Sequence, residues 1–249
     1  MESIQEQNTV SKPIELKNMK RYFEKEDAVC KLITGNGTGT GFFCKFIINN
    51  KPMKALFTNN HVLKEDLIKN NSNILIRHND EIKEIKLTSN RFKFTNEEYD
   101  YTCIQIFDNE SYNDFFEIDD NINCNNPDHQ YRNKLCVLFQ FPGEEDLSFG
   151  EGIIKGIIND YQIIHNITSD KGSSGSPIVL SDNLKVIGIH RGSFNDSNQG
   201  IFFNFILKDI QNQLNKNNQK ILPIKTINFD GKDFDIYYYK QYRENGEKW

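Results

Sequence analysis

The sequence predicts an all-β protein, because most of it consists of short apolar segments separated by turn signals such as Asn49-Asn50 and Asn79-Asp80. Two sets of these segments stand on either side of a polar stretch at 108–133 that is rich in Asn and Asp, as expected for antiparallel β-barrels. The expected strands are 28–33, 41–48, 55–58, 74–77, 82–87 and 102–107 in the first set, and 135–141, 150–158, 161–168, 177–180, 186–190 and 200–204 in the second.

The remaining segments lie at the two ends of the chain. Residues 1–24 are polar and are expected to form an N-terminal arm. Apolar residues at positions 206, 207, 210 and 214 have helical spacing and predict a helix over 205–216. Residues 219–249 form a C-terminal extension with two strand-like runs, 221–227 and 234–239. Nothing in the extension indicates chemistry, so the sequence leaves its role open.

The composition fits a globular protein. The chain has 249 residues, enough for one large β-domain or two small barrels with a core. Hydrophobic residues make up 37% and charged residues 26%, and no apolar run approaches the roughly 20 residues of a membrane span. The net charge of −5 argues against nucleic acid as a partner, because phosphate binding depends on clusters of Lys and Arg.

The cysteines and the N-terminus bear on the cellular compartment. Residues 1–7 lack the basic and then apolar profile of a secretory signal. The five cysteines are odd in number, contain no Cys-x-x-Cys pair, and lie mostly in apolar strand-like runs, where buried free thiols are expected. We therefore expect a reduced, cytoplasmic protein, and a mature fragment that has lost a signal peptide is the alternative. The cysteines are Cys30, Cys44, Cys103, Cys124 and Cys136.

The most informative segment is the hexapeptide Gly-Ser-Ser-Gly-Ser-Pro at 172–177, which leads from a polar loop into the apolar run 178–180. Serine becomes a nucleophile where the chain turns sharply, exposes the hydroxyl and directs backbone N–H groups at the oxyanion that forms on attack. Glycines on both sides permit such a turn. An ordinary Gly/Ser hairpin loop is the alternative for the hexapeptide taken alone.

Two further motifs precede this loop. Residues 55–63 end an apolar strand and then place His61 before a short helical turn, and Asp100 opens another strand-like run. Taken singly, His61 would more often be a structural residue and Asp100 a turn former. Glu97 and Glu98 compete for the role of the acid. The three residues stand in the order His, Asp, Ser, each at a strand boundary.

The three motifs together resemble those of trypsin-like (chymotrypsin-fold) serine proteases. The resemblance covers roughly 25–216 and implies a peptidase domain over 25–218. It implies two six-stranded antiparallel β-barrels, the first at about 25–115 and the second at about 130–218, followed by a C-terminal helix.

The resemblance also implies the roles of the motif residues. The protein would be a serine endopeptidase in which Ser174 attacks the peptide bond, His61 is the general base and Asp100 orients the imidazole. The backbone N–H groups of Gly172 and Ser174 would form the oxyanion hole. The expected partner is a peptide or protein substrate, and no metal or other cofactor is implied.

The same family suggests where the substrate side chain binds. The S1 pocket holds P1, the substrate residue whose carbonyl is attacked, and the family's count places Thr168 and Ser169 on its floor. No Asp stands there, which disfavours cleavage after basic residues. The pattern Gly-Ile-His-x-Gly at 188–192 resembles bacterial glutamyl endopeptidases and, more loosely, viral chymotrypsin-like proteases. In both, the His helps to bind an acidic or amide P1 side chain, so His190 is the third candidate; a barrel-edge residue is the alternative.

One departure from the family concerns activation. In trypsin-type zymogens a freed N-terminal amine pairs with an Asp directly before the nucleophile, whereas this sequence has Ser173 there and no Ile-Val-Gly-Gly segment ahead of the first barrel. That salt bridge is not expected here. The sequence leaves open whether the oxyanion loop forms constitutively or is ordered by a protein regulator or activator, or by the C-terminal segment.

Two other function classes fit the sequence less well. A catalytically silent trypsin-like fold that serves as a peptide-binding or scaffolding module is the second hypothesis, disfavoured because all three triad positions are filled. An esterase of the α/β-hydrolase type places its Ser before the acid and the His, between a strand and a helix, and does not fit. The Gly-rich run 35–41 lacks the Lys-Ser/Thr of a phosphate loop. Asp119-Asp120 is expected in a solvated loop.

Overall fold

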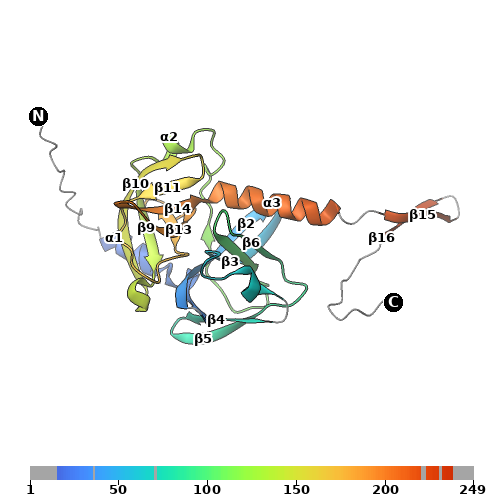
Figure 1. Cartoon of the computed structure of the whole chain (residues 1–249), viewed down its shortest axis with the longest axis horizontal. Coiled ribbons are helices and arrows are strands. Elements are labelled where there is room, and N and C mark those ends of the chain that lie inside the picture. The colour runs from blue at the N-terminus through green and yellow to red at the C-terminus, as the bar shows by residue number, and fades with distance from the viewer. Residues whose placement is uncertain (1–15, 36, 70–71, 220–222, 230–231, 238–249) are drawn as a thin grey trace, which may run out of the picture.

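The computed structural model describes residues 16–35, 37–69, 72–219, 223–229 and 232–237. Within these ranges two β units lie side by side, and helix α3 (Phe203–Gln219) follows the second unit (Figure 1). The all-β fold class predicted from the sequence is confirmed.

The first β unit is a curled sheet of eight strands, a half-barrel. Seven strands follow the order β5-β4-β1-β2-β3-β7-β6, and β8 pairs in parallel with β2. The sequence predicts six strands here, because β6 and β8 have only four and two residues, too few to show an alternating pattern. The strands are β1 (Val29–Thr34), β2 (Gly37–Ile48), β3 (Lys51–Thr58), β4 (Asn73–His78), β5 (Glu81–Lys86), β6 (Lys93–Asn96), β7 (Tyr101–Gln105) and β8 (Phe116–Glu117).

The second β unit is a closed barrel of six strands in the order β10-β11-β14-β13-β12-β9. All six were expected from the sequence, with ends that differ by a few residues. Closure removes the unpaired edges that an open sheet would leave. The strands are β9 (Leu135–Gln140), β10 (Ser148–Ile158), β11 (Gln162–His165), β12 (Pro177–Leu180), β13 (Val186–Phe194) and β14 (Ser197–Phe202).

The turn signals in the sequence have the geometry that tight hairpins need. Asn49 and Asn50, between β2 and β3, have φ angles of 50° and 58°, and Asn79 and Asp80, between β4 and β5, have 52° and 60°. Positive φ at both central residues is typical of two-residue hairpins, and Asn and Asp tolerate it better than most residues. The first turn sets the register of β2 against β3, on which the site depends, and the second sets that of β4 against β5.

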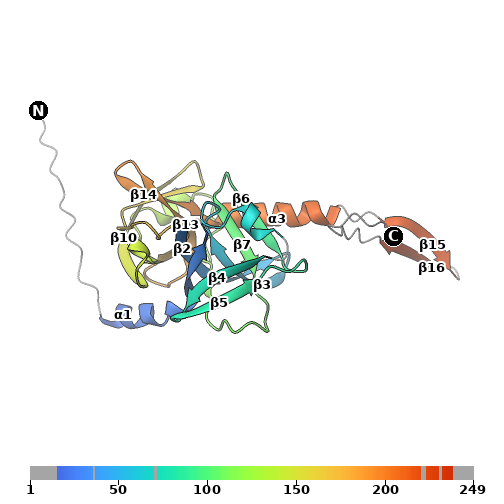
Figure 2. The same ribbon diagram turned by 60° about the horizontal axis from the view of Figure 1, so that its bottom comes forward.

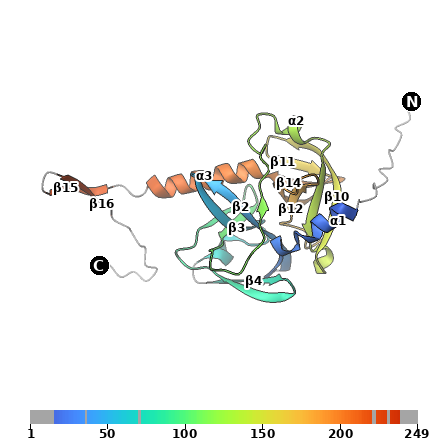
Figure 3. The ribbon, with the colours of Figure 1, turned by 180° about the vertical axis from the view of Figure 1, so that it is seen from behind.

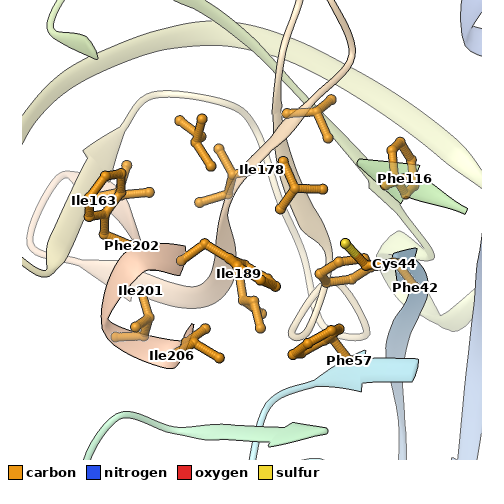
Figure 4. Packing of buried hydrophobic residues seen from close by; sticks show 14 of the residues in the cluster. Phe42, Cys44, Phe57, Phe116, Ile163, Ile178, Ile189, Ile201, Phe202 and Ile206 are labelled. Carbon is orange, nitrogen blue, oxygen red and sulfur yellow. The ribbon is translucent and has the colours of Figure 1, made fainter. Parts of the chain in front are cut away.

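One hydrophobic core joins the two units. Figure 4 shows side chains of the first sheet, such as Phe42 and Phe57, packed near those of the second barrel and of α3, such as Ile178 and Ile206. Phe203, the first residue of α3, contacts the rings of Phe42 and Phe57 at centroid distances of 6.4 and 4.9 Å. The shared core fixes the two units relative to each other, and residues from both can therefore build one site.

Part of the stretch expected to be a polar arm is helical. Helix α1 (Leu16–Phe23) carries Tyr22, which is buried and makes edge contacts with Phe139 and Phe149 of the second barrel. The hydroxyl of Tyr22 shares a hydrogen bond of 2.8 Å with Ser181. A single aromatic anchor in a polar segment gives no periodic pattern, so the sequence did not indicate this docking. Residues 1–15 lie outside the described residues.

The connection between the units also differs from expectation at one position. Asp119, expected in a solvated loop, is buried, and its carboxylate accepts hydrogen bonds from Tyr131 Oη (2.7 Å) and Asn183 Nδ2 (3.0 Å). Tyr131 ends the short helix α2 (Pro127–Tyr131). A buried carboxylate is stable where donors surround it, and those donors come from residues 12 and 64 positions away, beyond any local pattern.

The C-terminal extension contains a hairpin of β15 (Pro223–Phe229) and β16 (Lys232–Tyr237), close to the two expected runs. This hairpin pairs with no strand of the two β units and lies beyond the far end of α3 (Figures 2 and 3). No helix in the described part of the chain is long and apolar enough to cross a membrane.

The cysteines have the state that the sequence predicts. All five are free; Cys124 is half-buried and the other four are buried. Burial raises the pKa of Cys30, Cys44, Cys103 and Cys136, since a thiolate is poorly solvated in the apolar core. These four thiols are packing residues.

Candidate active site

The first two candidate residues come together because their strands are neighbours. His61 lies in the turn that follows β3, and Asp100 directly precedes β7. Strands β3 and β7 pair with Thr58 opposite Thr102, so the end of one strand lies beside the start of the other. The two residues are 39 positions apart in sequence and form one cluster in space.

The Asp100 carboxylate holds His61 at two points. Its Oδ1 accepts from the backbone N–H of His61 at 2.9 Å, and its Oδ2 lies 2.8 Å from Nδ1 of the ring. Because a carboxylate can only accept, the neutral form of the ring carries its proton on Nδ1 and has a free lone pair on Nε2. The side chain of Asp100 is 5% exposed and that of His61 is 47% exposed. The carboxylate is therefore buried behind an accessible ring.

The backbone of Asp100 is shaped for this contact. Its φ of 48° is unusual for a residue with a side chain, although Asp tolerates it better than most. The side chain of Asn59 donates to the backbone carbonyl of Asp100 at 2.9 Å and holds the turn in place. Asn59 precedes His61 by two residues, so one short segment binds both ends of Asp100.

Arg191 links this pair to the second barrel, a contact that no pattern in the sequence indicates. Its Nε forms an ion pair with Asp100 Oδ2 at 3.1 Å, beside the His61 contact. Arg191 follows His190 on β13, and the backbone carbonyl of Arg191 accepts a hydrogen bond from Ser174 Oγ at 3.3 Å. Arg191 thus contacts two of the three triad candidates. It belongs to the Gly-Ile-His-x-Gly motif on β13, which resembles a strand that lines the S1 pocket.

The loop around Ser174 is a turn that only glycines permit at two positions. Gly172 and Gly175 both have φ of 91°. A Cβ on Gly172 would collide with the carbonyl oxygen of Phe141, and one on Gly175 with the carbonyl oxygen of Thr40. The glycine requirement inferred from the sequence has this physical origin.

The backbone donors of this loop are free to bind an anion. Within the described part of the chain, the N–H groups of Gly172 and Ser174 take part in none of the hydrogen bonds. The other polar groups of the loop are occupied: Gly175 N–H donates to His190 O (3.0 Å), and Ser173 O accepts from Ser176 N–H (3.1 Å) and Ser176 Oγ (2.7 Å). Two unused donors on a pinned loop are what an oxyanion needs.

His190 is 1% exposed and is therefore not a barrel-edge residue. It lies against a second buried histidine, His165, which no sequence motif indicated. His165 Nε2 lies 3.2 Å from His190 Nδ1, and the backbone N–H of Ile167 donates to His165 Nδ1 at 3.3 Å. Burial lowers the pKa of His165 to about 3; burial and the nearby His61 lower that of His190 to about 4. Both rings are therefore neutral at pH 7.

This pair has one consistent arrangement of protons. His165 Nδ1 accepts from Ile167, so the neutral ring of His165 carries its proton on Nε2 and donates to His190 Nδ1. His190 then carries its own proton on Nε2. The order of donors, assigned from the hydrogen-bond network, runs from Ile167 through His165 to His190, and the backbone of Gln199 also hydrogen-bonds to the His190 ring.

The remaining candidates are less closely tied to the site. Thr168 is exposed and Ser169 is half-buried, and no hydrogen bond in the described part of the chain joins either of them to His190. The carbonyl of Thr168 accepts from Gln140 Nε2 at 3.0 Å. Glu97, a competitor for the acid role, is part of the turn that precedes Asp100, and its carbonyl accepts from the backbone N–H of Asp100. The described ranges contain no group of three or more His, Cys, Asp or Glu side chains arranged to hold a metal ion.

Comparison with known proteins identifies the family. A model of the trypsin-like peptidase domain matches residues 39–189, more than half of the chain. The chain belongs to that family. The prediction of a serine-type endopeptidase, a hydrolase that acts on peptide or protein substrates, is thereby confirmed. No curated protein matches this trypsin-like peptidase by sequence.

Solved structures share the fold of this trypsin-like peptidase. A serine endoprotease from Yersinia pestis superposes with a TM-score of 0.58 at 15% identity, over 86% of this chain and 73% of that one. An inactive form of Rv3671c from M. tuberculosis H37Rv superposes with a TM-score of 0.54 at 15% identity, over 78% of this chain and 88% of that one. At this identity the likeness is one of fold.

Proposed function

We propose that this peptidase cleaves peptide bonds with Ser174 as nucleophile, His61 as general base and Asp100 as the residue that fixes the imidazole. The observation that carries the proposal is the double contact of the buried Asp100 carboxylate with the backbone and ring of His61. This contact selects the tautomer with a free Nε2, which is the form that can remove a proton from serine.

The reaction follows from these positions. Ser174 Oγ rotates from the Arg191 carbonyl toward Nε2 of His61, attacks the scissile carbonyl carbon and passes its proton to Nε2. The carbonyl oxygen becomes an oxyanion and is bound by the N–H groups of Gly172 and Ser174. His61 then protonates the leaving amine, and water hydrolyses the acyl-enzyme by the same steps in reverse.

His190 supports a preference for an acidic or amide P1 residue. Its Nε2–H is a neutral donor close enough to His61 for the charge of His61 to affect it. Such a donor suits the oxygen of a Gln side chain, or that of a Glu side chain. Thr168 and Ser169 would add hydroxyl donors at the pocket entrance.

A peptide library that varies only P1 tests the function and the preference separately. We expect cleavage by the native protein, none by Ser174→Ala, and the fastest cleavage after Gln or Glu. Cleavage that survives in Ser174→Ala would contradict the proposed mechanism. Ser174-dependent cleavage after Arg or Phe would contradict only the role given to His190. No cleavage of any peptide by the folded protein would favour the peptide-binding module instead.

A further inference from the structure

Thr40 makes an unusual set of contacts to the nucleophile loop from the opposite β unit. It lies on β2 and is fully buried. Its backbone N–H donates to Ser174 O at 2.8 Å, and its hydroxyl donates to Gly172 O at 2.8 Å. The same hydroxyl accepts from the backbone N–H of Phe141 at 3.2 Å. Every polar atom of Thr40 that faces this loop is in use.

A second threonine holds Thr40 in position. Thr58, at the end of β3, is 1% exposed, and its hydroxyl donates to Thr40 O at 2.8 Å. The contacts therefore run from β3 through β2 to the loop, across the shared core. A buried polar group without a hydrogen-bond partner costs free energy, so each group in this series of hydrogen bonds restrains its neighbour.

These contacts restrain the peptide planes around the Ser174 N–H, one of the two proposed oxyanion donors. Thr40 binds the carbonyls of Gly172 and Ser174, which belong to the peptide planes on either side of the one that carries the Ser174 N–H. Ser176 holds the carbonyl of that middle plane. A plane whose carbonyl is held cannot rotate, so its N–H direction is fixed as well. The loop needs such a restraint, because Gly172 permits more than one backbone state.

We propose that Thr40 is a positioning residue that keeps the nucleophile loop in its oxyanion-binding state without a cleaved N-terminus. The proposal rests on the proposed function, since it concerns the oxyanion hole of that reaction. It accounts for Ser173 at the position where zymogen activation would need an Asp. Ser173 is buried, and its side-chain oxygen accepts from the backbone N–H of Asp170 at 3.1 Å, so it closes the loop locally.

The rate of labelling by a fluorophosphonate probe tests this proposal without knowledge of the substrate. In labelling, Ser174 Oγ bonds to phosphorus, the P–F bond breaks with loss of fluoride, and the hydroxyl proton passes to His61. The phosphonyl oxygen occupies the oxyanion hole, so the labelling rate reports on the loop. Thr40→Val removes the hydroxyl at nearly constant volume, and Thr40→Ser keeps it.

We expect Thr40→Val to lower the maximal labelling rate by about 10- to 100-fold, somewhat less than the loss of a whole oxyanion donor. The probe concentration at half-maximal rate should change little, and Thr40→Ser should restore the native rate. Ser181→Ala is the matched control: it removes another buried hydroxyl, bonded to Tyr22, and should label like the native protein. A general loss of stability would affect both variants, whereas mispositioning affects only Thr40→Val.

The outcomes separate this proposal from the proposed function. If the native protein does not label, the proposed function fails. If native protein labels and Thr40→Val labels at the same rate, Thr40 is not a positioning residue. If Thr40→Val does not fold, Thr58→Val gives the answer, because it removes only the hydroxyl behind Thr40. We expect Thr58→Val to label roughly threefold more slowly, and a native rate would overturn the proposal.

Discussion

Replacing Asp100 with Asn probes the contact on which the proposed mechanism depends. The amide has nearly the shape of the carboxylate but can accept at only one of its two atoms. In the native protein Oδ1 faces the backbone N–H of His61, and Oδ2 faces both His61 Nδ1 and Arg191 Nε. All three of these neighbours carry N–H groups. In the Asn variant, the NH2 group at one of the two positions must therefore face another N–H group.

The structure indicates which position the amide nitrogen takes. The backbone N–H of His61 cannot be reoriented, whereas the side chain of Arg191 is 39% exposed and can move away. The NH2 group should therefore replace Oδ2 and donate to Nδ1 of His61. The imidazole proton then moves to Nε2, and the lone pair that should receive the serine proton is lost.

The expected cost is that of losing the general base. We predict that kcat at pH 7 falls by roughly a hundredfold to ten-thousandfold, which raises the barrier by about 2.7–5.5 kcal/mol. The ratio of the kcat values is measured by comparing turnover of one peptide substrate by the native protein and by Asp100→Asn. Asp119→Asn is the control, because Asp119 is another buried carboxylate that accepts from a Tyr hydroxyl outside the site. A kcat within tenfold of native for Asp100→Asn would refute the tautomer argument.

Three further predictions follow from burial and backbone geometry. Gly172→Ala should abolish labelling by a fluorophosphonate while the protein remains folded, because its Cβ would collide with Phe141 O and its φ is 91°; labelling at the native rate would show that the loop can relax. The pKa of His165 is lowered by burial from 6.5 to about 3, so its stabilising contribution is complete above pH 6.5 and is lost as the pH falls toward 3. Urea unfolding between pH 6 and 4 should therefore show the native free energy of unfolding falling more steeply than that of His165→Gln, by up to about 1.4 kcal/mol per pH unit, and parallel curves would contradict this. With a thiol reagent under native conditions, Cys124 should react first, since the other four cysteines are buried; mass spectrometry of the modified peptides would identify the site, and prompt modification of Cys30 or Cys103 would contradict it.

The sequence predicted those parts of the structure that depend on local patterns. Strands of the second barrel alternate or form short apolar runs, and the turns at Asn49-Asn50 and Asn79-Asp80 carry the residues that positive φ favours. The loop at 172–177 was recognisable because its glycines are required by the backbone itself. His61 and Asp100 were predicted from order along the chain, and their contact required the pairing of β3 with β7.

What the sequence did not indicate depends on contacts between distant segments. No sequence motif marked three strand residues whose contacts appear only in the folded protein: Thr40, Arg191 and His165. Asp119 was expected in solvent because the two side chains that donate to it, Tyr131 and Asn183, are remote in sequence. Tyr22 docks as a lone aromatic residue. In each case the pattern lacked a period, a motif or a spacing that could have predicted the contact.

Fluorophosphonate labelling followed by mass spectrometry of the modified peptide tests the central claim most directly. The account predicts one adduct, on Ser174, that is absent in Ser174→Ala and in His61→Ala while both variants stay folded. Thr102→Val is an additional control for effects on folding near the site. It removes the native Thr102 hydroxyl, which donates to Leu63 O. An adduct on another residue, or a native rate of labelling in His61→Ala, would contradict a serine activated by His61 and Asp100.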